Sequence, residues 1–282
     1  MIMHDVPTNW PFAQHSFHVK TAKYDWHVQR LGQGPKILLI HGTGASTHSW
    51  KPLIDFAQSR AEFLNIDLPG HGYSGRPRLG QSSIPAITDG VAQLLDQQAF
   101  APDYIIGHSA GAAIAVSLGS RMGVERVIAI NAAFAEFSGI FASLFPMVAR
   151  TLVVAPFVGR ILAHIGRDPN AIKRILLQTG SQIPPQQMQY YQRLFESQHH
   201  IQGTLQLMAD WSIRDFNAAL PDMAQPIHFI TAAQDRTVPP QTSQYWADRL
   251  PEARLTKIPH GGHLIHEEAP DLVWTAAFGD FG

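Results

Sequence analysis

Residues 107–111 read Gly-His-Ser-Ala-Gly and follow an apolar run at residues 104–106. A serine between two glycines at the end of such a run fits a tight turn from a strand into a helix, because a Cβ at either flank would clash. This turn lifts the Ser109 hydroxyl clear of the sheet and places the Ala110 backbone N–H at the start of the following helix. The pattern predicts a serine nucleophile at Ser109 and an oxyanion donor at Ala110.

A serine hydroxyl is a weak nucleophile and needs a base within hydrogen-bond reach, together with a third group that orients the base. Asp235 follows an apolar run at residues 227–231, and His263 follows two glycines after a run at residues 254–258. Both therefore lie in loops after predicted strands, in the chain order serine, aspartate, histidine. The sequence predicts Asp235 as the orienting acid and His263 as the base.

A second oxyanion donor is expected from the loop after the apolar run at residues 36–40. Residues 41–44 read His-Gly-Thr-Gly, and the two glycines allow the backbone to approach a reacting group closely. We assign the Thr43 N–H to this role, opposite the Ala110 N–H. Each such donor contributes about 3 to 4 kcal/mol in comparable sites.

Other histidines and carboxylates compete for these roles. His260 and His266 flank the predicted base at a spacing that could suggest a metal site, but with only loop context and no cysteine we predict no metal ion and no cofactor. We interpret His260 as a turn residue and His266 as a helix-start residue. Asp67 also follows an apolar run, but it precedes the nucleophile in the chain and is interpreted as a loop-fixing residue.

The composition narrows the class of protein. The chain has 282 residues, with 21 Lys and Arg, 22 Asp and Glu, and no cysteine. A formal net charge of −1 gives no reason to expect a nucleic-acid partner, and the lack of cysteine excludes disulfides, Cys-ligated zinc and a cysteine nucleophile. The first residues carry neither a basic nor an apolar signal segment, so we expect a cytoplasmic protein.

Apolar runs that alternate with amphipathic patterns predict the elements that position these loops. Solid apolar strands between helices indicate an α/β fold with a mostly parallel, twisted sheet and helices on both faces. We expect strands at residues 16–20, 24–30, 36–40, 62–66, 104–106, 126–130, 227–231 and 254–258. We expect helices at residues 49–58, from Pro85, directly after Ser109, at 241–250 and from about Glu268.

Residues 132–220 are predicted to form a helical cap inserted between two late strands, which leaves residues 1–131 and 221–282 as the α/β core. The insert has no clear strand pattern. Pro146 and Pro156 each begin a similar short stretch, which predicts two short helices. Further helices are expected at residues 171–178, 186–195 and 201–211. Such a cap would cover the carboxyl edge of the sheet, where ligands bind in open α/β sheets.

The cap has a positive bias between residues 139 and 195. Asp168 is the one acidic residue there, whereas six residues are basic: Arg150, Arg160, Arg167, Lys173, Arg174 and Arg193. Such charges commonly solvate helix faces. The functional alternative is that the cap meets a large apolar substrate carrying a carboxylate, or an anionic membrane surface.

Taken together, these motifs resemble the α/β-hydrolase superfamily over nearly the full chain. More narrowly, the chain is similar to the magnesium-chelatase accessory hydrolases of bacteriochlorophyll biosynthesis. The narrower likeness rests on residues 26–30 (Trp-His-Val-Gln-Arg), 41–45, 48–50 and 107–113 and, in the cap, on Thr179-Gly180-Ser181 and residues 208–211. The chain has no phosphate-binding loop of the Gly-rich Lys-Ser or Lys-Thr type, so it departs from the ATP-driven chelatase subunit.

The resemblance implies an esterase acting on a tetrapyrrole (porphyrin) ester, or a role beside magnesium insertion into a porphyrin. The expected partners are an apolar small-molecule substrate and, for the second role, magnesium chelatase or a membrane surface. The alternatives are a non-hydrolytic tetrapyrrole-binding or chelatase accessory protein, and a general carboxylesterase or carbon–carbon bond hydrolase. An epoxide hydrolase or haloalkane dehalogenase is disfavoured, because those enzymes need a carboxylate at position 109.

Overall fold

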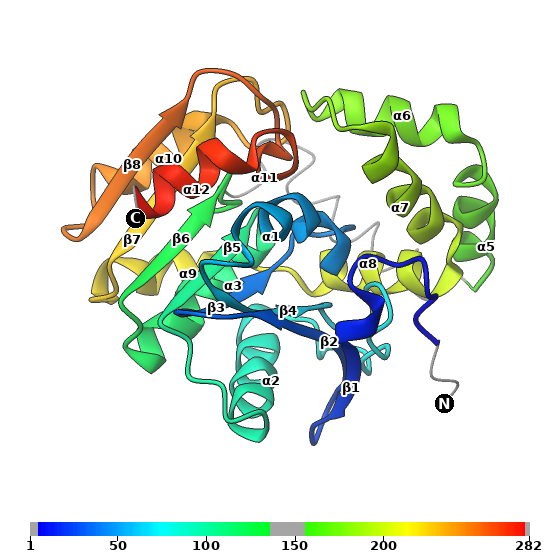
Figure 1. The fold of residues 1–282 in the computed structure, drawn as a ribbon, viewed down its shortest axis with the longest axis horizontal. Helices are drawn as coiled ribbons and strands as arrows, with labels where there is room; N and C mark the ends of the chain where they lie inside the picture. The colour runs from blue at the N-terminus through cyan, green and yellow to red at the C-terminus, as the bar shows by residue number, and fades with distance from the viewer. Residues whose placement is uncertain (1–4, 136–155, 280–282) are drawn as a thin grey trace.

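Eight strands form one sheet in the order β1-β2-β4-β3-β5-β6-β7-β8 (Figure 1). The computed structural model describes residues 5–135 and 156–279. Strand β2 pairs antiparallel with β1 and β4, and all other pairs are parallel, which confirms the predicted fold class. The strands are β1 (Ser16–Lys20), β2 (Asp25–Gly32), β3 (Lys36–Ile40), β4 (Glu62–Ile66), β5 (Tyr104–His108), β6 (Arg126–Ile130), β7 (Ile227–Ala232) and β8 (Ala253–Ile258).

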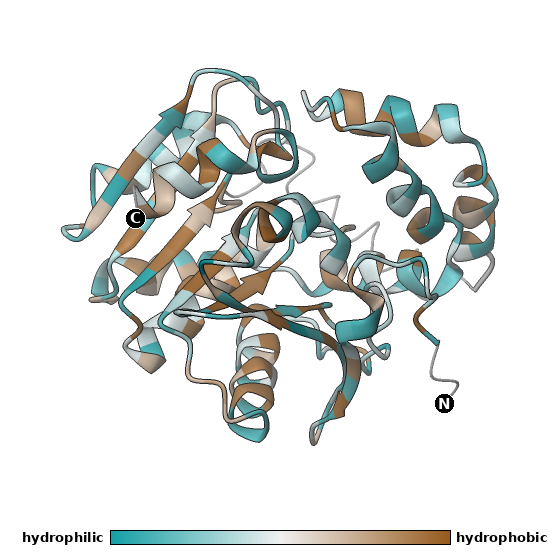
Figure 2. Cartoon of the chain, viewed as in Figure 1, coloured by the Kyte–Doolittle hydropathy of each residue, from teal (hydrophilic) through white to brown (hydrophobic). Residues whose placement is uncertain are grey.

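The two faces of the sheet are covered by different helices, because successive side chains of a strand point to opposite faces. In β3, Leu38 and Ile40 pack with α2 (Ile84–Gln97) and α3 (Ala110–Met122), whereas Ile37 and Leu39 pack on the other face. That second face is covered by α1 (Lys51–Ala57) and α12 (Pro270–Phe278). Hydrophobic residues run along the length of β6 in Figure 2, as expected for a strand buried on both faces.

Five described helices lie between β6 and β7, and the first four of them, α5 to α8, stand beside the sheet in Figure 1. They are α5 (Pro156–Ile165), α6 (Pro169–Gln178), α7 (Pro185–Glu196), α8 (Gln198–Asp210) and α9 (Arg214–Ala219). The helix predicted from Pro156 is therefore present, and the one predicted from Pro146 lies outside the described residues. Among the described helices, none is long and apolar enough to cross a bilayer.

Three predicted helix boundaries are wrong for local chemical reasons. The expected helix at residues 49–58 begins as a 3-10 turn, η2 (Thr47–Trp50), before α1. Helix α2 begins one residue before Pro85, because the Ser83 side chain caps it by accepting a hydrogen bond from the Ala86 N–H. The helix predicted from about Glu268 is α12, which begins at Pro270, and a separate short helix, α11 (Ile265–Glu268), precedes it, since Pro270 can begin a helix but cannot continue one. Two further short elements, α10 (Pro240–Ala247) and the 3-10 turn η3 (Leu220–Asp222), flank β7.

Candidate active site

The Ser109 turn joins β5 directly to α3. Ser109 has a φ of 53° and a ψ of −117°, a region that non-glycine residues rarely adopt. A Cβ on Gly107 would lie 2.5 Å from the Gly111 carbonyl oxygen, and a Cβ on Gly111 would lie 2.3 Å from the Ile40 carbonyl oxygen. The backbones of β3 and α3 are therefore in direct contact, which explains the need for glycine on both sides of the serine.

The predicted acid and base are brought together by the loops after β7 and β8. His263 Nδ1 lies 2.8 Å from Asp235 Oδ2, and both side chains are buried. The other carboxylate oxygen, Oδ1, accepts the backbone N–H groups of Thr237 and Val238 at 2.8 and 2.9 Å. Because a carboxylate only accepts, this contact places the ring proton of His263 on Nδ1 and leaves the Nε2 lone pair available.

Ser109 and His263 line the same pocket. In the described part of the chain, no hydrogen bond joins Ser109 Oγ to the His263 ring. Catalytic hydrogen bonds are often long in free enzymes and tighten only with substrate, so the arrangement is compatible with general-base catalysis.

The backbone of His263 is held by two side chains of the core. Its carbonyl oxygen accepts from Asn131 Nδ2 at 2.9 Å and lies 2.8 Å from His108 Nε2. Asn131 also accepts from the Ala232 N–H, so it connects the ends of β6, β7 and the base loop. The role of Asn131 was not predicted from the sequence. The available signal was an asparagine directly after a buried strand, a residue type that tolerates its positive φ of 45°.

The loop that carries Thr43 is in contact with the nucleophile turn. A Cβ on Gly42 would lie 3.0 Å from Ser109 Cβ, and Thr43 and Ala110 both line the pocket. Neither the Thr43 nor the Ala110 N–H donates a hydrogen bond to another described residue. Both N–H groups therefore have no acceptor among the described residues.

The side chains of Asp67 and His41 fix the loop that carries Thr43 through hydrogen bonds. Asp67 Oδ1 accepts the Thr47 N–H at 2.6 Å, and its other oxygen lies 2.7 Å from His27 Nδ1. Burial alone would raise the pKa of Asp67, but the neighbouring His27 outweighs it and lowers that pKa below the ordinary value. His41 Nε2 accepts the Leu68 N–H at 2.9 Å, and burial lowers the pKa of His41, so the ring stays neutral and can accept. Asp67 is thus used in the loop structure, as the sequence predicts.

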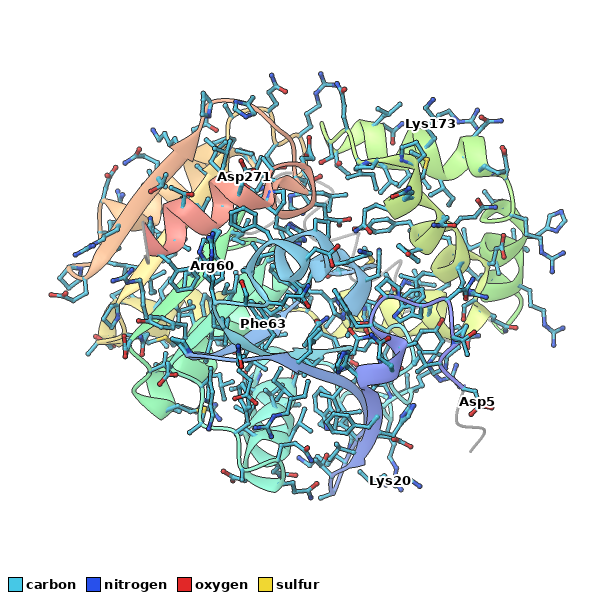
Figure 3. The ribbon with its side chains drawn as sticks, in the orientation of Figure 1. Asp5, Lys20, Arg60, Phe63, Lys173 and Asp271 are labelled. Carbon is cyan, nitrogen blue, oxygen red and sulfur yellow. The ribbon has the colours of Figure 1, made fainter. Side chains whose placement is uncertain are left out.

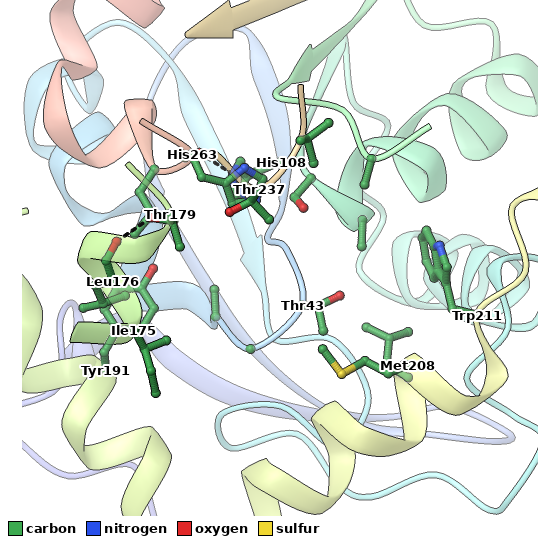
Figure 4. Close-up of a pocket in the computed structure, with 18 of the residues that line it drawn as sticks. Thr43, His108, Ile175, Leu176, Thr179, Tyr191, Met208, Trp211, Thr237 and His263 are labelled. Carbon is green, nitrogen blue, oxygen red and sulfur yellow. Dashed lines mark hydrogen bonds between the residues drawn. The ribbon is translucent and has the colours of Figure 1, made fainter. Parts of the chain in front are cut away.

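The pocket above Ser109 has a volume of about 560 Å³ and is mostly apolar (Figure 4). Cap residues supply much of its lining: Ile175, Leu176, Tyr191, Met208 and Trp211 surround the space opposite His263 and Thr237. Among the described residues that line it, none is Lys, Arg, Asp or Glu. The cavity therefore suits an uncharged, apolar ligand, in the size range of small-molecule sites.

The basic residues of the cap face solvent. All five within the described residues, Arg160, Arg167, Lys173, Arg174 and Arg193, are exposed and none lines the pocket. Lys173 points outward from α6 in Figure 3. These residues do not form an anion site inside the described pocket. The alternative that the cap meets a substrate carboxylate or an anionic membrane surface therefore stays a prediction.

His266 is a packing residue. It is completely buried and packs at a tilt against Trp50 and His108, with ring centroids 4.6 and 4.4 Å apart. Burial, followed by the charge of His263, lowers its pKa to about 3, so its ring is neutral at physiological pH. His260 is exposed. Within residues 5–135 and 156–279, no three metal-ligating side chains are grouped in a way that could hold a metal ion.

A buried carboxyl group, which sequence reasoning missed, lies behind the pocket. Glu267 of α11 accepts hydrogen bonds from the Tyr191 hydroxyl and from Gln187 Nε2, at 2.8 Å for the latter. Both donors belong to α7, so this contact joins the cap to the core. Burial raises the pKa of Glu267 to about 8.

Stability is expected to depend on pH through Glu267. Its folded-state pKa lies above the ordinary carboxyl value, so between the two the folded state holds a proton that the unfolded state has lost. The contribution is complete below the unfolded-state pKa and is lost as pH rises toward 8, by up to about 1.4 kcal/mol per pH unit. Glu267→Gln should remove this decline. Urea unfolding of wild type and variant at pH 5, 7 and 8.5 measures the difference.

The exposed carboxyl of Glu196, also on α7, provides the matched control. Glu196→Gln should keep the wild-type dependence of unfolding free energy on pH. An equal slope in Glu267→Gln and wild type would contradict the assignment of this pH dependence to Glu267.

Comparison with known proteins agrees with this architecture. Residues 35–270 match the family model described as the alpha/beta hydrolase fold. The magnesium-chelatase 30 kDa subunit of Rhodobacter capsulatus is 37% identical over 94% of this chain and 94% of its own length. A pimeloyl-[acyl-carrier protein] methyl ester esterase of Stenotrophomonas maltophilia is 25% identical over 84% of this chain and 89% of its own. An alpha/beta hydrolase fold protein from Burkholderia ambifaria, 20% identical, superposes with a TM-score of 0.74 over 94% of this chain and 99% of that one.

Proposed function

Since the chain belongs to the α/β-hydrolase family, we propose that it is a serine hydrolase that cleaves carboxylic esters with a triad of Ser109, His263 and Asp235. The observation that carries this proposal is the 2.8 Å contact between His263 Nδ1 and Asp235 Oδ2, at the wall of a pocket that Ser109 also lines. An imidazole oriented by a carboxylate, in the same pocket as a serine at a strained turn, is the arrangement that nucleophilic acyl transfer requires.

The proposed reaction has two halves. Ser109 Oγ attacks the ester carbonyl carbon while His263 Nε2 takes the hydroxyl proton, and the tetrahedral intermediate collapses as His263 returns that proton to the departing alcohol. Water then attacks the acyl-serine carbonyl, with His263 again accepting a proton, and the carboxylic acid leaves as Ser109 regains its hydrogen. Asp235 stays ionised and stabilises the imidazolium that forms in each half.

Thr43 and Ala110 are proposed to bind the oxyanion through their backbone N–H groups. Negative charge develops on the carbonyl oxygen in both halves, and fixed donors in a site with little water stabilise it without reorganisation. Support comes from the position of both residues in the pocket lining and from their lack of a described hydrogen-bond acceptor.

The pocket lining favours a particular chemical form of the substrate. The described side chains that line the pocket with Ser109 include no Lys, Arg, Asp or Glu, which favours an esterified carboxyl group over an ionised one as ligand. With the likeness to a magnesium-chelatase subunit, this supports a tetrapyrrole ester of the bacteriochlorophyll pathway as substrate, next to the magnesium-chelation step. We take residues 132–220 as the cap that shapes this pocket, over a core of residues 1–131 and 221–282.

A second candidate function is a non-hydrolytic one, in which the protein binds a tetrapyrrole or assists magnesium chelatase. The name of the Rhodobacter capsulatus relative favours it. The further alternative is a general carboxylesterase or carbon–carbon bond hydrolase. As part of the accessory role, we propose that the protein is cytoplasmic and associates with a chelatase or a membrane surface. The exposed Ile161 and Ile165, beside Arg160 on α5, support such an association.

A substrate comparison tests the proposed function. Purified protein is offered a porphyrin methyl ester and a short acyl ester such as 4-nitrophenyl acetate, and hydrolysis of each is followed. We expect kcat/KM to be at least about tenfold higher for the porphyrin ester, because more apolar surface contributes to transition-state binding. Turnover of the short ester alone would favour a general carboxylesterase. Failure of the folded protein to hydrolyse either ester would favour the non-hydrolytic role.

A further inference from the structure

The cap residues between α6 and α7 lie directly against the loops of the acid and the base. Residues 179–181 are the Thr-Gly-Ser stretch on which the family resemblance partly rests, and Thr179 lines the pocket beside His263 (Figure 4). None of these three residues takes part in the proposed chemistry. Their contacts show a different role.

The carbonyl oxygen of Thr179 accepts two backbone hydrogen bonds. One comes from the N–H of Arg236, the neighbour of the acid Asp235, at 3.1 Å, and the other comes from the N–H of His263 at 3.2 Å. A single acceptor therefore holds both loops, although the two donors are far apart in the sequence. This contact constrains the separation of the acid and the base.

Two more contacts hold the base loop on either side of His263. Ser181 Oγ accepts the N–H of Leu264 at 2.8 Å, and Ser181 is 1% exposed. The Glu268 carboxylate accepts the N–H of Gly262 at 2.9 Å with one oxygen and that of Gln182 at 3.1 Å with the other. Thr179 and Ser181 thus hold the chain at and after the base, and the Glu268 carboxylate connects Gln182 to the residue before the base.

The approach is so close that it requires glycine in both segments. Gly180 has a φ of +86°, and a Cβ on it would lie 2.1 Å from the Gln234 carbonyl oxygen. A Cβ on Gly262 would lie 2.2 Å from the Gly180 carbonyl carbon. The backbones touch without side chains between them, which leaves little freedom for relative movement.

We propose that residues 179–182 are a positioning element of the active site, through which the cap fixes His263 against Asp235. This inference rests on the proposed function of the triad. The backbone of the base is held from two directions: its N–H by Thr179 of the cap, and its C=O by Asn131 and His108 of the core. The cap therefore contributes to the geometry of general-base catalysis as well as covering the pocket. Its end at residues 179–182 stays fixed during turnover.

Ser181→Ala is the variant that tests this role with the least change in volume. It leaves the buried Leu264 N–H without an acceptor and loosens the base loop, while the described pocket lining stays intact. We expect kcat and the rate of Ser109 modification by a fluorophosphonate to fall about tenfold, because small displacements of a catalytic group are costly, with KM little changed. We also expect the pH at which activity falls on the acid side to shift, because the contact of His263 with Asp235 is altered.

Ser197→Ala is the matched control, because Ser197 is also a cap serine whose Oγ accepts a backbone N–H, that of His200, but it does not contact the base loop. It should keep the wild-type modification rate and pH profile. Ser181→Thr, which keeps the oxygen, should restore most of the rate. If Ser181→Ala is too unstable to assay, the Ser181→Thr protein is compared with Gly180→Ala, which moves the same segment.

The outcomes separate the two proposals. A wild-type protein that reacts with the fluorophosphonate, together with a Ser181→Ala protein that reacts equally fast with an unchanged pH profile, would overturn the positioning role alone. A folded wild-type protein that does not react would overturn the proposed function instead.

Discussion

Replacing Ser109 by alanine is expected to lower ester hydrolysis by about 10⁴-fold or more, the range seen when a nucleophile of this kind is removed. The reason is that no covalent acyl intermediate can form, although the proposed oxyanion donors and the apolar pocket remain. Folding should be unaffected, since alanine removes only the Oγ, which forms no hydrogen bond with His263. Steady-state kinetics on an ester that the wild type hydrolyses measures the loss.

The control for this variant lies on the same helix. Ser120 is exposed at the far end of α3, and Ser120→Ala should keep full activity. A Ser109→Ala protein that retained more than about a tenth of the wild-type rate would rule out Ser109 as the nucleophile. If it lost ester hydrolysis but still supported pigment synthesis in cells, the non-hydrolytic accessory role would be favoured over esterase activity.

Asp235→Asn is expected to reduce kcat by about 10⁴-fold at neutral pH with little change in KM. An asparagine amide can donate to His263 Nδ1, which would move the ring proton to Nε2 and remove the lone pair that must accept the Ser109 proton. The backbone contacts from Thr237 and Val238 can still be accepted by the amide oxygen. Kinetics over a range of pH, with circular dichroism as a check on folding, measures the effect.

Asp248→Asn, at an exposed carboxylate just after α10, should leave kcat unchanged. A loss of less than about tenfold in Asp235→Asn would assign the orienting role elsewhere. Asp67 is the other buried aspartate beside a histidine, but its oxygens are occupied by Thr47 and His27.

The sequence predicts the framework of the site because the framework depends on local patterns. The glycines around Ser109 and the apolar runs of β5, β7 and β8 are short-range features, and parallel strands place their following loops at one edge of the sheet. That edge is where Asp235 and His263 meet.

The rest of the site depends on contacts between distant segments, for which a single sequence holds no local signal. The hydrogen bonds of Thr179 to the acid and base loops and of Glu267 to α7 join residues from different elements. The sequence also does not show whether the basic side chains of the cap face the pocket or the solvent. The amphipathic pattern of a helix fixes which residues share a face but not what that face contacts. Lys173 and its neighbours turned out to face solvent.

The most direct test of Ser109 as the nucleophile is covalent modification of the native protein by a fluorophosphonate, followed by mass spectrometry of the digested chain. Such probes react with a serine only when a base and an oxyanion site activate it. We expect one phosphonyl group per chain, on Ser109, and no modification of the folded His263→Ala protein over the same period. A folded wild-type protein that stays unmodified, or that carries the group on another residue, would contradict it.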